Sequence, residues 1–343
     1  MKKIMTLMIL LVSNFAALCF AGKPQVTLMT HDSFGMSKQV LADFETALGA
    51  KLRILKSGDA GEALNKAILS KNNPLADIFY GVDNTFLSRA LDEDLFDAYP
   101  PKGLEDIDPA LILDKRHRLI PVDYGDVCLN YDIAWFKKNS FQPPQSLEDL
   151  ILPQYKGSLV VQNPATSSPG LAFLLATISR FGQNKYIDYW QKLKANDLLI
   201  VNGWKDAYWG HFTAASKGSR PMVVSYASSP AAEVFYAKTP PKTAPTGVMT
   251  GNGSAFRQVE FAGILKNSPN PVLAKKAMDF ILSTRFQEDI PLQMFVFPAN
   301  KRAVLPEVFK THAKITKNPA QLSHERINKN RDKWIREWTE HML

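Results

Sequence analysis

Short β-branched runs alternate with helical patterns through the first part of this chain, and this alternation constrains the fold more than any other feature. Each apolar run is typical of a strand, and the stretch after it has apolar residues every three or four positions, as on one face of a helix. The predicted strands and helices alternate in the order 25–30, 37–48, 51–56, 61–71, 77–82 and 84–94. A βαβαβ order predicts a parallel sheet with helices on both faces, and ligands of such sheets collect at the carboxyl ends of the strands.

A long extended run, residues 119–132, separates this series from a second one. It is longer than a typical strand, as expected for a segment that crosses between two domains. The second series contains predicted strands at 158–163, 198–202 and 221–226, predicted helices after Pro169 and at 184–196, and later a strand at 260–265 and a helix at 271–284. A chain of 343 residues, 45% of them hydrophobic, is long enough for about two domains. We therefore expect an α/β protein with two lobes, more than one crossing between them, and a small-molecule cleft at their junction.

The first 21 residues have the features of a secretory signal peptide. Lys2 belongs to a positive start, residues 4–15 are mostly apolar, and small residues precede a cleavage position after Ala21. A membrane anchor is the alternative, but Ser13 and Asn14 interrupt an apolar run that is already short for a bilayer. We expect cleavage after Ala21, export to the periplasm and no direct membrane span.

The positive charge of the chain lies mostly outside its predicted core. Lys and Arg number 41 against 33 Asp and Glu, which gives a formal net charge of +8. Two of these charges belong to the predicted signal peptide, and residues 301–343 contain ten Lys and Arg against five Asp and Glu. The basic residues are not grouped along a groove with interleaved aromatics, so we expect no nucleic-acid partner. Residues 301–343 are predicted to form a solvated basic segment that is helical near 332–341.

Polar side chains follow the first two predicted strands, where a ligand would lie. His31 comes after the strand at 25–30, and Asp59 comes after the strand at 51–56. Asp59 is also well placed to cap the next helix, which is the purely structural alternative. As a ligand contact, a carboxylate at this edge would suit an amine or a positive charge.

The segment around Ser167 and Ser168 predicts a helix start. Ser168 as the capping residue, with Pro169 at the first helical position, is a strong start signal. The two hydroxyls and the free backbone N–H groups at such a start also form a site suited to an anion. Most helix starts bind nothing, so a plain cap remains the alternative.

Aromatic and hydroxyl side chains gather at three later places in the chain. These are Trp204 with Tyr208, then Tyr226 with Ser228 and Ser229, and finally Phe295. Trp204 and Tyr208 lie four residues apart and share a helical face, so they either pack in the core or offer a flat face to a heteroaromatic or cationic ligand. For Phe295, core packing is the default interpretation.

The sequence contains no motif typical of catalysis or metal binding. The six histidines show no paired ligand spacing, and Cys128 is the one cysteine left after the predicted cleavage. G-x-S-x-G, P-loop and G-x-G-x-x-G motifs are absent. We expect a protein without enzyme activity, metal ion or resident cofactor.

Several segments, taken in order, resemble the periplasmic thiamine-binding proteins of ABC importers, which are type II extracellular solute-binding proteins. They are VTLMTHDSF, VDYG, NPATSSPGL, NGWKDAY, VVSYASSPA and AKKAMDFILSTRFQ, and they run from about Val26 to Asn300. The resemblance implies the two-lobed type II fold, with mixed sheets flanked by helices, lobe 1 at 22–122 and about 255–300, and lobe 2 at about 123–254. It also implies a transported ligand (thiamine, thiamine monophosphate or thiamine diphosphate), a membrane permease and its ATPase as partners, and a monomer.

The resemblance further implies which residues contact the ligand. They are Asp59, Ala60, Ser167, Ser168, Trp204, Tyr226, Ala227, Ser228 and Ser229. His31 stands where relatives carry an aromatic residue that stacks on the ligand, and Phe295 stands where a Trp is found. These two departures are expected to retune the stacking, each contact of this kind contributing roughly 0.5–2 kcal/mol.

Two alternative functions remain open from the sequence. Ferric carriers and other small-solute carriers share the fold, but ferric carriers have adjacent tyrosines at the position of Tyr226, where Ala227 follows here. A thiaminase-like enzyme would need a nucleophilic cysteine in the cleft. Cys128 has no adjacent histidine, and a small buried cysteine is far more common than a nucleophile.

Overall fold

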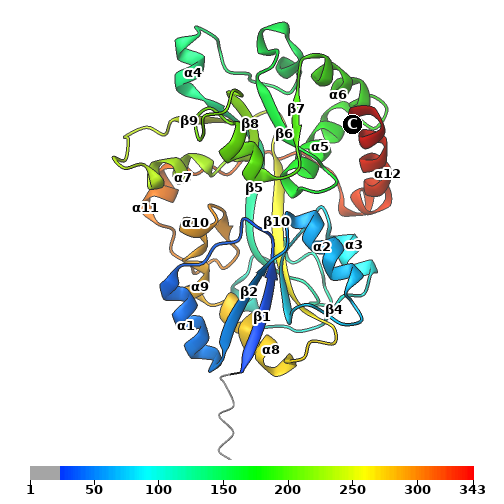
Figure 1. Cartoon of the computed structure of the whole chain (residues 1–343), viewed down its shortest axis with the longest axis vertical. Helices are drawn as coiled ribbons and strands as arrows, with labels where there is room; N and C mark the ends of the chain where they lie inside the picture. Colours follow the sequence, from blue (N-terminus) through cyan, green and yellow to red (C-terminus); the bar gives the residue numbers. More distant parts are fainter. Residues whose placement is uncertain (1–23) are drawn as a thin grey trace, which may run out of the picture.

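One mixed sheet runs through two lobes in the computed structural model, which describes residues 24–343 (Figure 1). The predicted signal peptide lies outside the described residues. Along the sheet the strands follow the order β2 (Lys51–Lys56), β1 (Gln25–Thr30), β3 (Ile78–Asp83), β10 (Phe256–Leu265), β5 (Ile120–Asp132), β8 (Met222–Tyr226), β6 (Leu159–Gln162) and β7 (Leu199–Val201). Three short strands pair beside this path, β4 (Phe96–Asp97) with β10, and β9 (Thr246–Met249) and β11 (Phe297–Pro298) with β5.

The lower lobe in Figure 1 begins with the predicted βαβαβ unit. β1 pairs in parallel with both β2 and β3, which confirms the parallel sheet. The helices between these strands are α1 (Lys38–Leu48) and α2 (Ala60–Leu69), and α3 (Leu87–Asp92) follows β3. Three later helices complete the lobe, α8 (Pro271–Ile281), α9 (Thr284–Gln287) and α10 (Ile290–Gln293). Phe44 of α1 packs edge-on against Phe280 of α8, with ring centroids 4.7 Å apart.

Two antiparallel strands, β5 and β10, carry the chain between the lobes. β5 has 13 residues, as the long extended run predicted. Its first half pairs with β10 and its second half with β8 and β9 of the upper lobe. β10 is longer than the predicted strand at 260–265, because it starts at Phe256. The chain therefore crosses twice through the sheet.

The upper lobe contains the second parallel unit, in which β6 pairs with β7 and β8. Its helices are α4 (Ile133–Lys138), α5 (Ser168–Phe181), α6 (Tyr186–Ala195) and α7 (Ser229–Tyr236). Every residue of α5 from Ser168 to Ile178 is buried. A helix that is apolar on all sides belongs in the centre of a lobe, and α5 fills that place.

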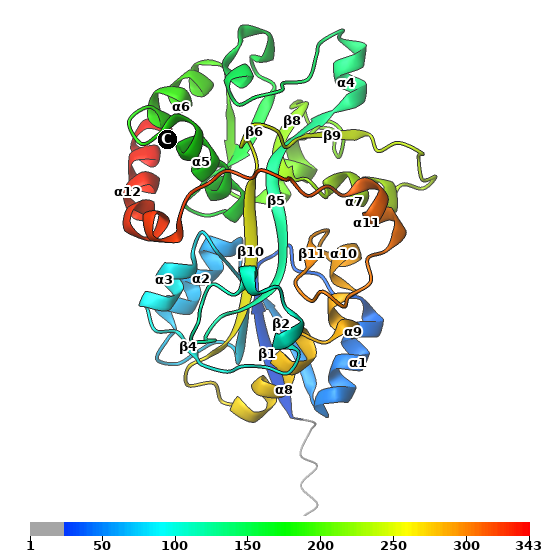
Figure 2. The ribbon, with the colours of Figure 1, turned by 180° about the vertical axis from the view of Figure 1, so that it is seen from behind.

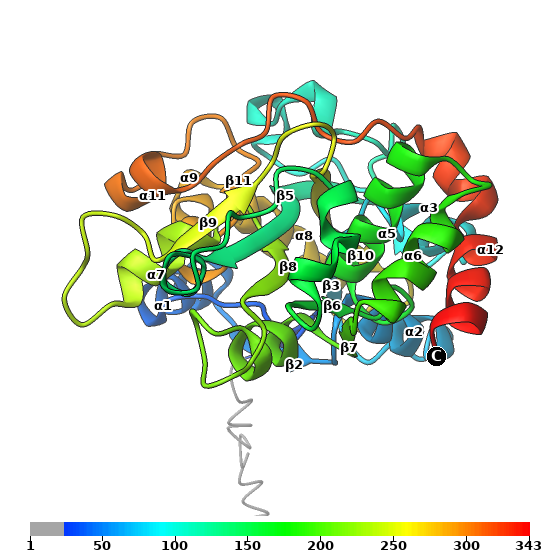
Figure 3. The same cartoon turned by 90° about the horizontal axis from the view of Figure 1, so that it is seen from above.

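The C-terminal segment packs against the protein, so the expectation of a solvated tail is wrong. After α11 (Glu307–His312) the chain runs across the back of β5 and β10 to α12 (His324–Met342), and the two helices lie at opposite edges of the molecule (Figures 2 and 3). Trp338 is fully buried and meets the Trp190 ring of α6 edge-on at 5.4 Å. The guanidinium of Arg331 lies 4.6 Å from the Phe86 ring of the lower lobe. The buried residues of α12 recur at helical spacing along one face of the helix. The charged residues on its other faces are more numerous and dominate the composition of the segment.

No helix among residues 24–343 is long and apolar enough to pass through a bilayer.

Candidate functional site

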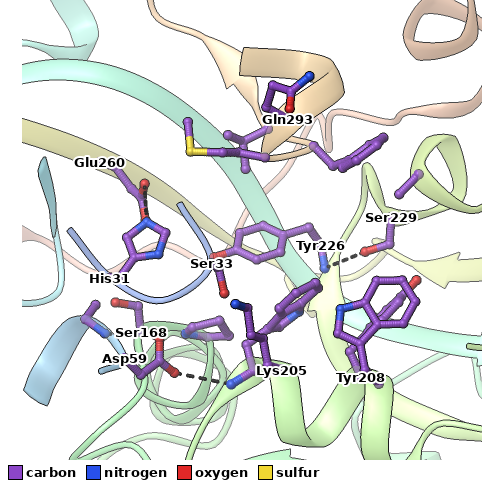
Figure 4. A pocket seen from close by; sticks show the side chains of 18 of the residues that line it. His31, Ser33, Asp59, Ser168, Lys205, Tyr208, Tyr226, Ser229, Glu260 and Gln293 are labelled. Atoms are coloured by element: carbon purple, nitrogen blue, oxygen red, sulfur yellow. Dashed lines mark hydrogen bonds and ion pairs between the residues drawn. The ribbon is translucent and has the colours of Figure 1, made fainter. Parts of the chain in front are cut away.

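A cavity of about 180 Å³ lies between the two lobes, and both lobes contribute to its wall (Figure 4). The lower lobe supplies side chains from the ends of β1 and β2, and the upper lobe supplies them from the start of α5, the segment after β7 and the end of β8. The crossing strand β10, the helix α7, and the end of α10 with the segment after it complete the wall. The lining residues are His31, Ser33, Asp59, Ala60, Ser168, Pro169, Trp204, Lys205, Tyr208, Trp209, Tyr226, Ser229, Ala232, Tyr236, Glu260, Gln293, Met294, Phe295 and Val296.

Asp59 links the lobes as well as capping a helix. Its Oδ1 accepts a hydrogen bond from Ala60 N at 3.0 Å at the start of α2, as a helix cap does. Its Oδ2 accepts from Trp204 N of the upper lobe at 3.2 Å. Burial raises the pKa of Asp59 above its usual value, and hydrogen bonds from Ser167 and the two backbone N–H groups oppose that rise. Both carboxylate oxygens of Asp59 therefore have backbone donors.

Trp204 presents a fixed indole ring to the cavity. Its Nε1 donates to Ser225 Oγ at 2.8 Å, and its ring stacks on Tyr208 with centroids 5.0 Å apart and planes 19° apart. Tyr208 is held in turn by Glu233, to which its hydroxyl donates at 2.5 Å. Because both partners of Trp204 are buried, the indole is positioned before any ligand arrives.

Tyr226 ends β8, and its ring lies in the middle of the cavity wall (Figure 4). The Tyr226 hydroxyl accepts from Gln258 Nε2 of the crossing strand at 3.1 Å. Its backbone N–H donates to Ser229 Oγ at 3.3 Å, and this oxygen lies 2.9 Å from Ser225 Oγ. The hydroxyls of Ser225 and Ser229 therefore connect the Tyr226 backbone to the Trp204 indole.

The start of α5 differs from the prediction. Ser167, not Ser168, is the capping residue, and it makes no side-chain cap bond. Ser168 is the first helical residue, and its hydroxyl donates to Asp83 of the lower lobe. Burial raises the pKa of Asp83 to about 6, because the carboxylate loses solvation that hydrogen bonds from Ser168 and Thr85 only partly replace. The helix start that was predicted to suit an anion therefore already faces a carboxyl group.

His31 forms an ion pair with a residue that sequence patterns did not single out. Its Nε2 lies 3.4 Å from Glu260 Oε2, and both side chains are only 10% exposed. Burial lowers the pKa of His31, but the charge and hydrogen bond of Glu260 outweigh it and raise the pKa above the usual value. His31 is therefore held as a polar, chargeable ring against the cavity (Figure 4).

Phe295 belongs to an aromatic group at the edge of the cavity. Its ring centroid lies 5.3 Å from that of Tyr236 and 6.0 Å from that of Phe235, both on α7 and both exposed. The backbone of Phe295 has a positive φ of 56°, and its carbonyl accepts a hydrogen bond from Ser228 of the upper lobe. This group therefore joins the lobes on the side where α7 lies.

The structure brings most of the predicted ligand contacts together on one wall. His31, Asp59, Ala60, Ser168, Trp204, Tyr226, Ser229 and Phe295 line the cavity, whereas Ser167, Ala227 and Ser228 are buried behind it. Their contact with a ligand stays a prediction. Lys205, Tyr208 and Trp209 line the cavity beside Trp204, in a segment whose aromatic content already marked it. Glu260 and Tyr236 had no local signal, since each lies inside a regular element.

Cys128 lies away from this wall. Its side chain is fully buried on β5 and packs with Ala227 and Ala255. Burial raises the pKa of its thiol well above the usual value, which is the opposite of what a nucleophilic cysteine needs. Among residues 24–343 no group of three or more His, Cys, Asp and Glu side chains is placed to hold a metal ion.

Two lobes joined by crossing strands, with a small cavity lined by both, are the architecture of a solute-binding protein. The chain belongs to the bacterial extracellular solute-binding protein family, whose profile matches residues 73–330. A thiamine-binding periplasmic protein of Salmonella typhimurium is 32% identical over 98% of both chains, and one of Brucella abortus is 32% identical over 92% of both. A solved structure titled periplasmic thiamin binding protein superimposes with a TM-score of 0.83 at 28% identity, covering 94% of this chain and 97% of that one.

Proposed function

We propose that this protein is the substrate-binding component of an ABC importer, that it captures thiamine in the periplasm, and that it delivers thiamine to a membrane permease. The observation that carries the proposal is the cavity wall. It combines fixed aromatic faces with two carboxylates, Asp59 and Glu260, from different parts of one fold. Relatives named as thiamine-binding periplasmic proteins match nearly the whole chain, which supports the same ligand here.

The chemistry of thiamine suits this wall. Thiamine has a cationic thiazolium ring, an aminopyrimidine and a hydroxyethyl tail. Trp204 and Tyr226 offer aromatic faces on which either ring can stack, and a cation over such a face gains about 0.5–2 kcal/mol. Lys205, which is exposed at the cavity, is available to a phosphate on the tail. We therefore include thiamine monophosphate and thiamine diphosphate among the candidate ligands.

His31 and Phe295 are expected to set the strength of stacking. His31 is held by Glu260, so its ring is more polar than the aromatic residue expected at this place. Phe295 provides a smaller face than a Trp would. Both line the cavity, so the departures from the thiamine-binding relatives act on the ligand itself rather than on the fold.

The remaining parts of the proposal follow from a carrier role. The protein acts without bond cleavage and without a resident cofactor, and its relatives are solute-binding proteins. Its partners are the permease and, through it, the ATPase. We propose a monomer in the periplasm, exported by cleavage after Ala21.

An equilibrium titration tests the proposal. The mature protein is titrated separately with thiamine, its monophosphate, its diphosphate and ferric citrate, while tryptophan fluorescence is recorded. Because Trp204 lines the cavity, thiamine should quench the fluorescence with a sub-micromolar Kd, an affinity of roughly 8 kcal/mol or more. Quenching by ferric citrate alone would favour an iron carrier, and loss of thiamine during incubation would favour an enzyme.

A further inference from the structure

Three carboxyl groups lie side by side where the sheet passes under the cavity. Glu260 of β10 is directly opposite Asp83 of β3 on one side and Asp123 of β5 on the other. All three residues are buried. Only Glu260 reaches the cavity wall, where it faces His31 (Figure 4). The register of three strands thus places two further carboxyl groups beside one lining residue.

The two carboxylates on the cavity wall have different partners. Asp59 accepts hydrogen bonds from two backbone N–H groups, at 3.0 and 3.2 Å, which satisfy both of its oxygens. Among residues 24–343, Glu260 accepts from no backbone N–H; its carboxyl contacts His31 Nε2 at 3.4 Å, Gln258 Nε2 at 3.4 Å and the carboxyl of Asp123. Both distances exceed the usual 2.9–3.0 Å for such donors. Glu260 is therefore less firmly bound by hydrogen bonds than Asp59, the other carboxylate on the cavity wall.

The surrounding groups leave Glu260 in a field that favours a further positive charge. Burial, together with the charge of Glu260, raises the pKa of Asp123 well above its usual value. Asp83 lies on the other side and is largely ionised at neutral pH. His31 is the buried basic side chain that faces Glu260, whereas Lys205 is exposed and donates to the carbonyl of Asp32.

We propose that Glu260, rather than Asp59, makes the cleft select a ligand with a cationic ring. This inference rests on the proposed function, and it names the feature of thiamine that the site recognises. Asp59 holds the lobes together through Trp204, while Glu260, with Asp83 beside it, attracts the thiazolium charge. An electrostatic contact with a buried charge distinguishes a cation from a neutral molecule of the same shape.

The test compares thiamine with a neutral isostere in which a thiophene ring replaces the thiazolium. Both ligands are titrated at low ionic strength into the mature wild-type protein and into the variants Glu260→Gln, Glu260→Asp and Asp59→Asn. Glu307→Gln makes the same chemical change at an exposed site and is the control. The quantity compared is the ratio of the two Kd values, because this ratio cancels general effects on closure.

We expect the wild type to bind thiamine at least about tenfold more tightly than the isostere, and Glu260→Gln to reduce this ratio to within about threefold. Glu260→Asp keeps the negative charge, but its shorter side chain moves that charge away from the cavity. Its ratio of Kd values should therefore fall between those of the wild type and Glu260→Gln. Asp59→Asn should raise the Kd of both ligands by a similar factor, and Glu307→Gln should change neither Kd.

The inference is overturned if Glu260→Gln keeps the wild-type ratio of Kd values. It is also overturned if Asp59→Asn is the one variant that loses the preference for thiamine. If Glu260→Gln does not fold, an unchanged ratio in Glu260→Asp overturns it instead. A wild type that binds neither ligand contradicts the proposed function, whereas tight binding of both without preference contradicts this inference alone.

Discussion

Asp83 shows how one buried side chain makes this protein sensitive to pH. Its carboxyl is buried between Ser168 and Thr85, and burial raises its pKa to about 6, against about 3.9 in an unfolded chain. The folded state therefore binds a proton more tightly than the unfolded state between pH 4 and pH 6. The resulting stabilisation is complete below about pH 4 and is lost as the pH rises through 6.

The variant Asp83→Asn should remove this dependence, because the amide does not titrate. Measured by urea unfolding, the free energy of unfolding of the variant relative to wild type should rise from pH 4 to pH 7.5. The expected rise is about 3 kcal/mol at most, from the linkage relation. A difference between variant and wild type that stays constant across this range would show that Asp83 is not the group responsible.

Phe295 is the residue at which the site should be easiest to improve. Its ring lies against Tyr236 at the exposed edge of the cavity, so a larger ring has space toward solvent. Phe295→Trp should lower the Kd for thiamine about two- to fivefold, since indole is the strongest cation–π partner. Phe235→Trp, which changes an exposed ring outside the cavity lining, is the matched control. Equal or weaker thiamine binding by Phe295→Trp in calorimetry would contradict a stacking role.

At the scale of elements, α12 stabilises the fold more than its charged composition suggests. Trp338 is fully buried against Trp190, and removal of such a side chain costs about 3–5 kcal/mol. Trp338→Ala should therefore lower the free energy of unfolding by about that amount and leave the thiamine Kd unchanged within about twofold. Leu343→Ala, at a residue 69% exposed, should change neither quantity. A Trp338→Ala protein as stable as wild type would show that α12 is dispensable.

The elements differ in how well the sequence predicts them, and the physical reason differs in each case. The start and end of β1 and β2 agree with the prediction, because their alternating apolar runs are bounded by polar turns. β10 was predicted only in its apolar second half, since pairing with β5 stabilises its polar first residues. α12 starts at His324, eight residues before the predicted helix, because only a narrow stripe of it faces the core.

The residues of the candidate site divide in the same way. Some are marked by a local sequence pattern, and others reach the site only through contacts between distant segments. Asp59 was identified because it follows a predicted strand, and Trp204 because it follows one in an unusually aromatic segment. Glu260 was missed, since its place beside Asp83 and Asp123 depends on the register of three strands far apart in sequence. The cap of α5 was misplaced by one residue because Ser168 bonds to Asp83 of the other lobe, a contact that no local pattern contains.

At the level of the whole molecule, the two lobes contact each other directly across the cleft. Gly61 N donates to Thr166 O across the cleft at 3.1 Å, and Trp204 N reaches Asp59. A Cβ atom at Gly61 would lie 2.9 Å from Ala165 O and 3.0 Å from Thr166 O, closer than side chains and backbone normally approach. The absence of a side chain at Gly61 therefore allows the cleft to close.

Gly61→Ala should hold the lobes apart without unfolding either one. We expect thiamine affinity to fall at least about tenfold, and the radius of gyration from X-ray scattering to stay at its unliganded value when thiamine is added. Gly251→Ala, where nothing lies within 4 Å of the added Cβ, should behave like wild type. Normal closure of Gly61→Ala on thiamine would contradict this role of the Gly61–Thr166 contact.

We propose that thiamine binds in the cavity between the lobes, on the Trp204 face. Isothermal titration of thiamine into the mature wild-type protein and into Trp204→Ala, side by side, distinguishes this site from any other. We predict one saturable site with a sub-micromolar Kd in the wild type, and a Kd raised at least about tenfold in Trp204→Ala, whose thermal unfolding is otherwise close to wild type. No heat of binding in the wild type, or equal Kd values in the two proteins, would contradict the claim.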